Sequence, residues 1–588
     1  SKVTDMNSMF SNCYKLTSLD VSNFDTSKVT DMNNMFTSCD NLTTLDVSNF
    51  VINDTINVTD IFKYATKIKY LKLDDVASLE KILPQLPTRS SSDKGHIVVY
   101  NPDALSSTAK TTLTNKNWEV HSVDECTVAA YGYDKTNCED LMPVFNEDYD
   151  TSALVISEHV HDGYFVHRDV MNFEGLLPTS ISFGGEVADD RTNALVEVGD
   201  VNLTGITDFS NMFKNCTNLR YINICVGEKD PVNVSHMFDG CSNLEMFDIY
   251  RMNLDNITTY EGMFAGCNKL AKIRLKDIQN PKFMNILNDP TNNFAEEKVI
   301  VSSKKFDLSE EEVAAFTAKG WGIKGMVAHY LYDKVICEDY LPVFNEGFEY
   351  EIIDYADKNR RVLRTIISDD CPTQMKFGIP TKNGAAAEEI ARVDSLLQVY
   401  SINAKELTTM ARMFQSCEEL INVNCYDWDT SNVTDMSYVF SNCYKLKNIN
   451  VSKWDISNVT DIKYFFFYCK DLIEELDLSQ WNTSNVRSAR YVFSNVHVPL
   501  NVSNWTIKDC DCFLMFGEYS AGLGYNGTTI TGLDTWNLSG TCDLRGMFMW
   551  CQHLNHSLNL NNWDVSQVTS MREIFASCYK VPENTYQS

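Results

Sequence analysis

VTDMNSMFSNCYKLTSLDVSNFDTSK, residues 3–28, decides the fold, because the same text starts again at Val29 as VTDMNNMFTSCDNLTTLDVSNF. A chain that repeats itself at a short fixed period is typical of a repeat architecture. The Phe of each Met-Phe-x-x-Cys marks the copies, and the step from Phe10 to Phe36 is 26 residues. The copies form three runs, which become irregular only between Phe493 and Phe548: Phe10, Phe36 and Phe62; Phe213, Phe238 and Phe264; then Phe414, Phe440, Phe466, Phe493, Phe516, Phe548 and Phe575.

Each copy changes its hydrophobic period midway. Apolar residues at 6, 9, 10 and 13 have the i, i+3, i+4, i+7 spacing of one helical face, so the pattern predicts a short helix. Leu19-Asp20-Val21 then alternates inward, outward and inward, as a short strand does. Neither half buries its apolar side alone, whereas stacked copies bury both. The sequence therefore predicts an α/β solenoid of the leucine-rich-repeat kind, interrupted by small, mostly β modules.

The consensus V-T-D-M-x-x-M-F-x-x-C-x-x-L-x-x-L-D-V-S-x-F-D resembles the BspA-like leucine-rich repeats of bacterial surface proteins. Val433–Asp455, VTDMSYVFSNCYKLKNINVSKWD, follows it almost throughout, and the resemblance covers all three runs. It implies display on a cell surface and binding to host or matrix molecules. It supplies no catalytic residues.

Between the runs, two other units each occur twice. A strand–helix–strand unit with a Trp after the helix is well suited to close the end of a solenoid. A mostly β module follows it, in which Tyr131–Asp150 matches Tyr330–Glu349. The predicted organisation is run 1 at 1–75, a strand–helix–strand cap at 76–126, a β module at 127–200, run 2 at 201–275, a cap at 276–326, a β module at 327–405 and run 3 at 406–588.

Bulk composition limits the classes of partner. The chain has 588 residues and a formal net charge of -30, so the phosphates of nucleic acid would be repelled. No apolar segment approaches the roughly 18 residues that a membrane span needs. Because Ser1 lies inside a repeat, we expect the sequence to be a fragment of a longer protein.

Nineteen cysteines could suggest a disulfide framework. Ten of them, however, occupy one repeat position, at the end of the predicted helical face. A small apolar residue is expected there, so we predict a column of buried free thiols. Its members are Cys13, Cys39, Cys216, Cys241, Cys267, Cys417, Cys443, Cys469, Cys551 and Cys578.

The outward position of each repeat strand is the candidate partner-binding surface, since one side chain per copy would lie in register along the strand face. The functional interpretation is binding of a basic, polyol or cationic partner. The structural interpretation, which we favour, is hydrogen bonding of Asp and Asn to the adjacent turn. The candidates are Asp20, Asp46, Lys72, Asn223, Asp248, Arg274, Asn424, Asn450 and Asp477.

Two further groups have more ordinary interpretations. Run 3 places a Trp in each turn where run 1 has Phe, and we expect a buried aromatic column rather than sugar-stacking rings. His159, His161 and His167 make a zinc site conceivable, but the second β module has no histidine there, so an exposed hairpin is preferred. No catalytic residue, cofactor or metal site is predicted.

These observations favour a non-enzymatic protein of the cell surface or extracellular space that binds a host or matrix protein or glycan. The alternative is a structural or fibre component of a large assembly, such as a virion, contacting neighbouring subunits.

Overall fold

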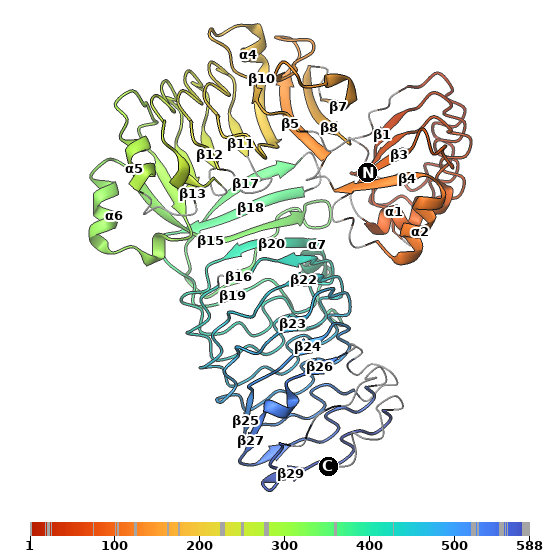
Figure 1. Cartoon of the computed structure of the whole chain (residues 1–588), viewed down its shortest axis with the longest axis vertical. Coiled ribbons are helices and arrows are strands. Elements are labelled where there is room, and N and C mark those ends of the chain that lie inside the picture. Colours follow the sequence, from red (N-terminus) through yellow and green to blue (C-terminus); the bar gives the residue numbers. More distant parts are fainter. Residues whose placement is uncertain are drawn as a thin grey trace. The chain divides into compact units, whose positions relative to one another are not determined.

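The computed structural model describes residues 3–578, apart from 18, 20, 22–23, 25, 54, 74–75, 100–101, 103–104, 123–125, 162–163, 174–176, 224–229, 249–251, 276–280, 358–360, 427, 519–524, 526–528, 552–557, 559 and 561. The chain forms two compact units, Ser1–Ile323 and Lys324–Ser588 (Figure 1). The division falls close to the end of the second predicted cap.

The short helix predicted in each repeat is wrong, because the described copies have successive turns there. Ser8 and Asn12 have φ values of 58° and 64°, in the left-handed region that a helix does not use. The backbone N–H groups donate to the next copy, as Ser8 does to the Asn33 carbonyl at 2.8 Å and Phe10 to the Met35 carbonyl at 2.9 Å. Hydrogen bonds between copies thus replace hydrogen bonds within a helix.

In the first unit, the second half of a copy forms a short strand, and the strands of successive copies pair in parallel. Leu45, Leu71 and Ile97 lie in register and are buried, so one apolar residue per strand points into the repeat. The strands of run 1 and its cap run in the order β1-β2-β3-β4: β1 Thr44–Asp46, β2 Tyr70–Lys72, β3 Gly95–Val99 and β4 Trp118–Ser122. Helices α1 (Val76–Ile82) and α2 (Ser107–Asn115) and the 3₁₀ turn η1 (Leu83–Gln85) complete this segment.

The first β module leads directly into run 2. Its β7–β8 hairpin pairs with β5, β5 pairs with β10, and β10 pairs in parallel with the first strand of run 2. The elements are β5 Thr127–Asp134, β6 Val144–Phe145, η3 Thr151–Ala153, β7 Leu154–His161, β8 Phe165–Asn172, β9 Ile181–Ser182, α4 Asp190–Ala194 and β10 Leu195–Val201. Run 2 and its cap comprise β11 Tyr221–Asn223, β12 Met246–Asp248, η4 Leu254–Asn256, β13 Lys272–Leu275, α5 Pro281–Leu287, β14 Val299–Ser302, η5 Lys305–Asp307 and α6 Glu310–Thr317.

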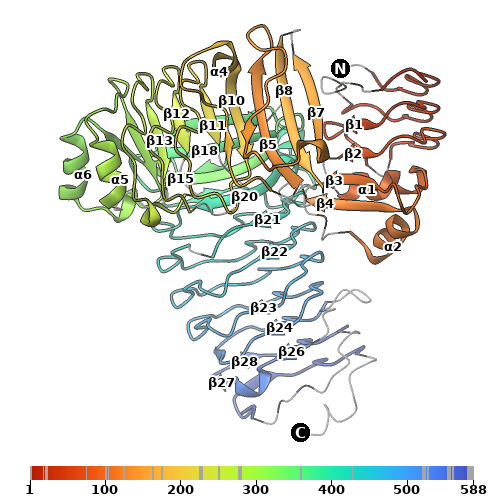
Figure 2. The same ribbon diagram turned by 45° about the horizontal axis from the view of Figure 1, so that its top comes forward.

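The second unit repeats this arrangement. The β17–β18 hairpin pairs with β15, β15 pairs with β20, and β20 starts a parallel series with β21 and β22. Figure 2 shows the later strands stacked along run 3. The elements are β15 Gly322–Asp333, β16 Val343–Phe344, β17 Glu351–Asp357, β18 Arg361–Ser368, β19 Met375–Lys376, α7 Ala387–Ser395, β20 Leu396–Ile402, β21 Asn422–Val423, β22 Asn448–Ile449, β23 Leu476–Asp477, β24 Leu500–Asn501, β25 Thr506–Lys508, β26 Ile530–Thr531, η6 Leu533–Thr535, β27 Asn537–Ser539, β28 Cys542–Asp543 and β29 Val568–Ser570.

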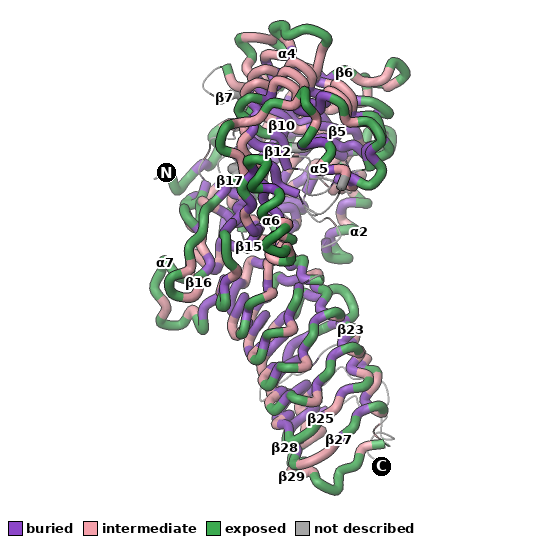
Figure 3. The backbone as a smooth tube through the Cα atoms, turned by 90° about the vertical axis from the view of Figure 1, so that its left-hand side faces the viewer, coloured by how far each residue is buried: buried purple, intermediate pink, exposed green. Residues whose placement is uncertain are grey.

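A column of stacked Phe rings forms the core of each run. Phe414 and Phe440 stack at 5.4 Å, and Phe516, in the irregular part, stacks on Phe548 at 5.1 Å. The β modules extend the column, because Phe183 and Phe377 stack on the first Phe of runs 2 and 3. Figure 3 shows buried, intermediate and exposed segments following one another along run 3.

Cysteine and tryptophan form two further columns. The Cys443 thiol donates to the Phe414 carbonyl of the preceding copy at 3.1 Å, and described column cysteines are free thiols. The Trp505 indole is fully buried, and its Nε1 donates to the Leu478 carbonyl at 2.9 Å. The prediction of a buried aromatic column is therefore confirmed. No helix among the described residues is long and apolar enough to cross a membrane.

Candidate functional site

The strand face of run 1 is covered by the first β module. Lys72 Nζ lies 2.5 Å from Asp169 Oδ2 on β8 and 3.6 Å from Asp46 Oδ2 on the neighbouring repeat strand. Both carboxylate side chains are at most 8% exposed. Asp46 also accepts hydrogen bonds from the backbone N–H and hydroxyl of Ser48. These contacts give Asp46 and Lys72 structural roles in holding the module on the run.

The run 2 candidates are also internally paired. Asp248 and Arg274 face each other in register on β12 and β13 and form a close ion pair. Both side chains are at most 5% exposed. Asn223 lies beside Asp248 in the sheet, but its side chain is not among those described, and Asp20 lies outside the described residues.

Run 3 presents the same repeat position to solvent. Asn424 and Asn450 directly follow β21 and β22, Asp477 ends β23, and all three residues are exposed. The Asn450 side-chain oxygen accepts from the Ser452 backbone N–H at 3.1 Å and hydroxyl at 2.7 Å. The Asn450 side chain therefore stabilises the turn and is also exposed to solvent.

A second row on the same face widens this surface. Asn422 and Asn448 lie two residues before the first row and pair in register, with Asn448 Nδ2 donating to Asn422 Oδ1 at 3.1 Å. Glu475 occupies the corresponding place before Asp477 and is exposed. Residues two apart in an extended strand share a face. We call these residues, Asn422, Asn424, Asn448, Asn450, Glu475 and Asp477, the amide strip.

The histidine hairpin is a β7–β8 pair, in which His159 lies opposite His167. His167 Nδ1 is 3.1 Å from Glu197 Oε1 on β10, reached across Gly132, which lies between them in the sheet. The side chains of His159 and His161 are not among those described. The described contact thus joins a histidine to a carboxylate of the module itself. His167 is buried, as is β8 from Val166 onward, so the expectation of an exposed hairpin is wrong for this strand.

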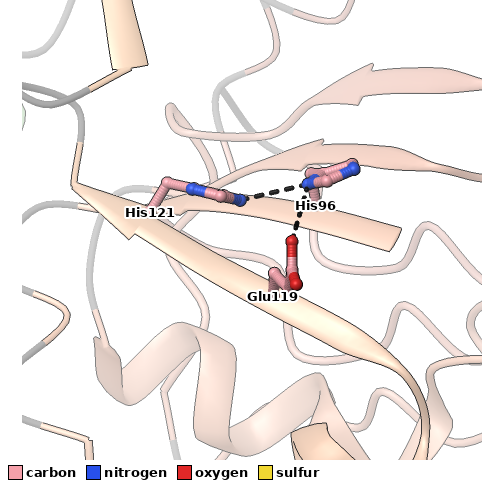
Figure 4. Close-up of side chains that lie close together, drawn as sticks. All are labelled: His96, Glu119 and His121. Atoms are coloured by element: carbon pink, nitrogen blue, oxygen red, sulfur yellow. Dashed lines mark hydrogen bonds and ion pairs between the residues drawn. The ribbon is translucent and has the colours of Figure 1, made fainter. Parts of the chain in front are cut away.

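A histidine–carboxylate cluster lies elsewhere, on the first cap, and sequence reasoning missed it. His96 on β3 lies in register with Glu119 on β4, and His121 lies two residues further along β4. His96 Nδ1 is 3.1 Å from His121 Nε2 and 3.7 Å from Glu119 Oε2. Figure 4 shows the three side chains pointing toward one another. The available signal was Glu-x-His at 119–121, which places two metal-ligand residue types on one strand face.

The protonation states at this cluster follow from its surroundings. Burial, reinforced by the neighbouring His121, lowers the pKa of His96 to about 4, so its imidazole is neutral near pH 7. A hydrogen bond from Lys94 lowers the pKa of Glu119, which is therefore a carboxylate. Neutral imidazoles and a carboxylate are the ligand forms that bind Zn²⁺.

Comparison with known protein families shows a similarity that extends over four segments of the chain. The family model described as "Mycoplasma protein of unknown function, DUF285" matches residues 1–84, 185–300, 389–505 and 515–587. The matched segments cover runs 1 and 2 and all of run 3 except 506–514 and 588, and two of them begin inside the β modules. No curated protein was found to be similar to the chain.

Proposed function

Because the chain belongs to the DUF285 family, whose description assigns no activity, we propose from its own surfaces that it is a non-enzymatic binding protein of the cell surface. In this proposal the three runs are BspA-like leucine-rich-repeat solenoids. Run 3 binds a host or matrix protein or a glycan on its strand face.

The exposed amide strip is the observation that carries this proposal. At the same repeat position, Asp46 and Lys72 are held by the β module, and Asp248 is paired with Arg274. Asn424, Asn450 and Asp477 instead remain exposed. Among the members of this position whose side chains are described, those of run 3 are therefore the ones open to a partner.

The chemistry of the strip suits a polar partner. Asn amides carry both donor and acceptor groups, a chemistry that matches sugar hydroxyls and peptide groups. The Asn450 oxygen already accepts two hydrogen bonds from Ser452, so this residue would act towards a partner as a donor. Neighbouring copies present these groups in register, so an extended ligand makes many weak contacts simultaneously. Glu475 and Asp477 add negative charge at one end, and any electrostatic contribution should weaken as salt is added.

The test replaces Asn424, Asn450 and Asp477 together with Ala. Wild type and variant are compared on a glycan array and against immobilised extracellular-matrix proteins at low and high salt. Glu406→Ala/Asp471→Ala is the matched control, because these exposed acidic residues lie in turns away from the strand face. We expect the triple variant to lose at least about tenfold in affinity, as removal of several hydrogen bonds implies, and the control to bind normally.

Unchanged binding of the triple variant would refute the strand face as the binding surface. If the purified chain self-associates and the triple variant does not, the strip joins neighbouring subunits, and the chain is an assembly component. Protease treatment of intact cells tests surface display, since a displayed chain is cleaved without lysis.

A further inference from the structure

We propose that His96, Glu119 and His121 bind a single divalent transition-metal ion, for which Zn²⁺ is the best match. Each residue offers one ligand atom, and these three atoms lie within 4.8 Å of one another. Two imidazoles and one carboxylate form a recognised three-ligand zinc set, in which water or another ligand occupies the fourth position. This inference is independent of the amide strip.

Two of the three separations between ligand atoms are close to those of a zinc site, and the third, between His121 and Glu119, is at most 4.8 Å. Zn–N bonds of about 2.0–2.1 Å in a tetrahedron place two ligand atoms about 3.3 Å apart. The His96–His121 and His96–Glu119 separations, 3.1 Å and 3.7 Å, lie on either side of this value. An ion among the three atoms therefore requires Glu119 and His121 to move closer together through side-chain rotation, while the two hydrogen-bonded strands keep their register.

Surrounding groups hold the ligands in place. Lys94 Nζ lies 2.5 Å from Glu119 Oε1, so the other carboxylate oxygen is the one directed at His96 (Figure 4). Phe173 lies with its ring centroid 4.9 Å from the centroids of both imidazoles. Tyr70, on the neighbouring strand β2, stacks on His96 with the two ring centroids 5.6 Å apart. Such outer contacts orient metal ligands and limit their freedom before an ion binds.

The second cap shows that the fold does not require these residues. Tyr70 pairs with His96 in the first cap, whereas Lys272 pairs with Val299 in the second. Aligning Trp118 with Trp321 places Gly322 at the position of Glu119 and Lys324 at that of His121. The same strand–helix–strand unit thus forms without any of the three ligands, which favours a role for them beyond folding.

The test is titration of the full chain with zinc chloride by isothermal calorimetry. We expect one saturable equivalent that His96→Ala/His121→Ala removes or weakens more than about 100-fold, a larger loss than the 10–100-fold typical of removing an outer-shell partner. Glu119→Gln should give an intermediate loss, because it retains the shape and removes the charge. His159→Ala/His161→Ala is the matched control, with two histidines removed from the hairpin.

Zinc K-edge X-ray absorption identifies the ligand atoms of the ion bound to the wild-type chain, so it tests the proposal even if a variant misfolds. A spectrum that shows two imidazole ligands and otherwise oxygen ligands around the zinc ion supports the site. Sulfur scatterers at about 2.3 Å would assign the ion to cysteines and overturn the proposal. The proposal also fails if no stoichiometric equivalent binds, if the His96→Ala/His121→Ala variant binds normally, or if the hairpin variant shows the same loss. In those cases His96 and His121 form only a hydrogen-bonded pair.

Discussion

Phe440→Ala should destabilise run 3 by about 4 kcal/mol. Phe440 is fully buried and stacks between Phe414 at 5.4 Å and Phe466 at 5.8 Å. Emptying a buried Phe site costs about 3–5 kcal/mol, and each lost ring contact contributes about 0.5–1.5 kcal/mol beyond its buried area. The two stacking partners argue against the lower end of that range, so we expect a loss of about 4 kcal/mol. Removal of the Asp435 side chain, which accepts one hydrogen bond from the Ser437 backbone N–H, should cost only about 1 kcal/mol.

Tryptophan fluorescence during urea unfolding measures this difference within run 3, because Trp118 and Trp321 are the two tryptophans outside it. With an m-value of about 2 kcal/mol per molar, a loss of about 4 kcal/mol lowers the midpoint by about 2 M. Phe36→Ala is the matched control, since Phe36 is equally buried in run 1 and stacks on Phe10 and Phe62. Similar midpoints for Phe440→Ala and Asp435→Ala, or an equal shift in Phe36→Ala, would refute the reasoning.

Three further outcomes are expected. Burial raises the pKa of Cys417 from 9.0 to about 12, so the thiol should resist alkylation at pH 8 until the chain unfolds. The contribution of this thiol to the free energy of unfolding should be lost as pH rises from about 9 to 12. Rapid labelling of Cys417 in the native chain would contradict this prediction. Trp505→Phe should cost about 1–2 kcal/mol in urea unfolding, because the Leu478 carbonyl loses its indole donor. Lys72→Met should speed amide exchange in β7 and β8, because buried carboxylates, including Asp169, lose their cation; unchanged exchange would mean that this contact does not hold the module.

Sequence patterns predicted which residues of a copy are inside but not the backbone that puts them there. In the second copy Met32, Met35, Phe36 and Cys39 have helical spacing, and a succession of turns buries all four; in the first copy, however, Met9 is 51% exposed. Ser8 and Asn12 adopt positive φ and the N–H groups bond to the next copy. Hydrogen bonds between copies depend on residues about 25 positions away, so a local window cannot distinguish them from helical ones.

The hairpins and the helix caps are easier to predict from the sequence, because the residues that determine them lie close together in the chain. The hairpin expected around His159 and His167 is present as β7 and β8, and Ser309 caps α6 through a reciprocal contact with Glu312, three residues later in the chain. The metal-ligand cluster was missed because His96 meets Glu119 and His121 only through the register of β3 and β4.

Long-range contacts decide which outward strand positions are open to a partner, and the repeat consensus does not encode these contacts. Lys72 and Asp169 are 97 residues apart in sequence, and their pairing is what buries the run 1 face. A buried carboxylate must be matched by a cation and hydrogen bonds, so the covered position takes an Asp with Lys72 beside it. An exposed position has no such requirement, and run 3 accordingly has the neutral amides Asn424 and Asn450 and the exposed carboxylate of Asp477 there. A buried ion pair, rather than charge alone, therefore marks the covered positions in runs 1 and 2, and Asn450→Asp should be tolerated where Lys72→Met is not.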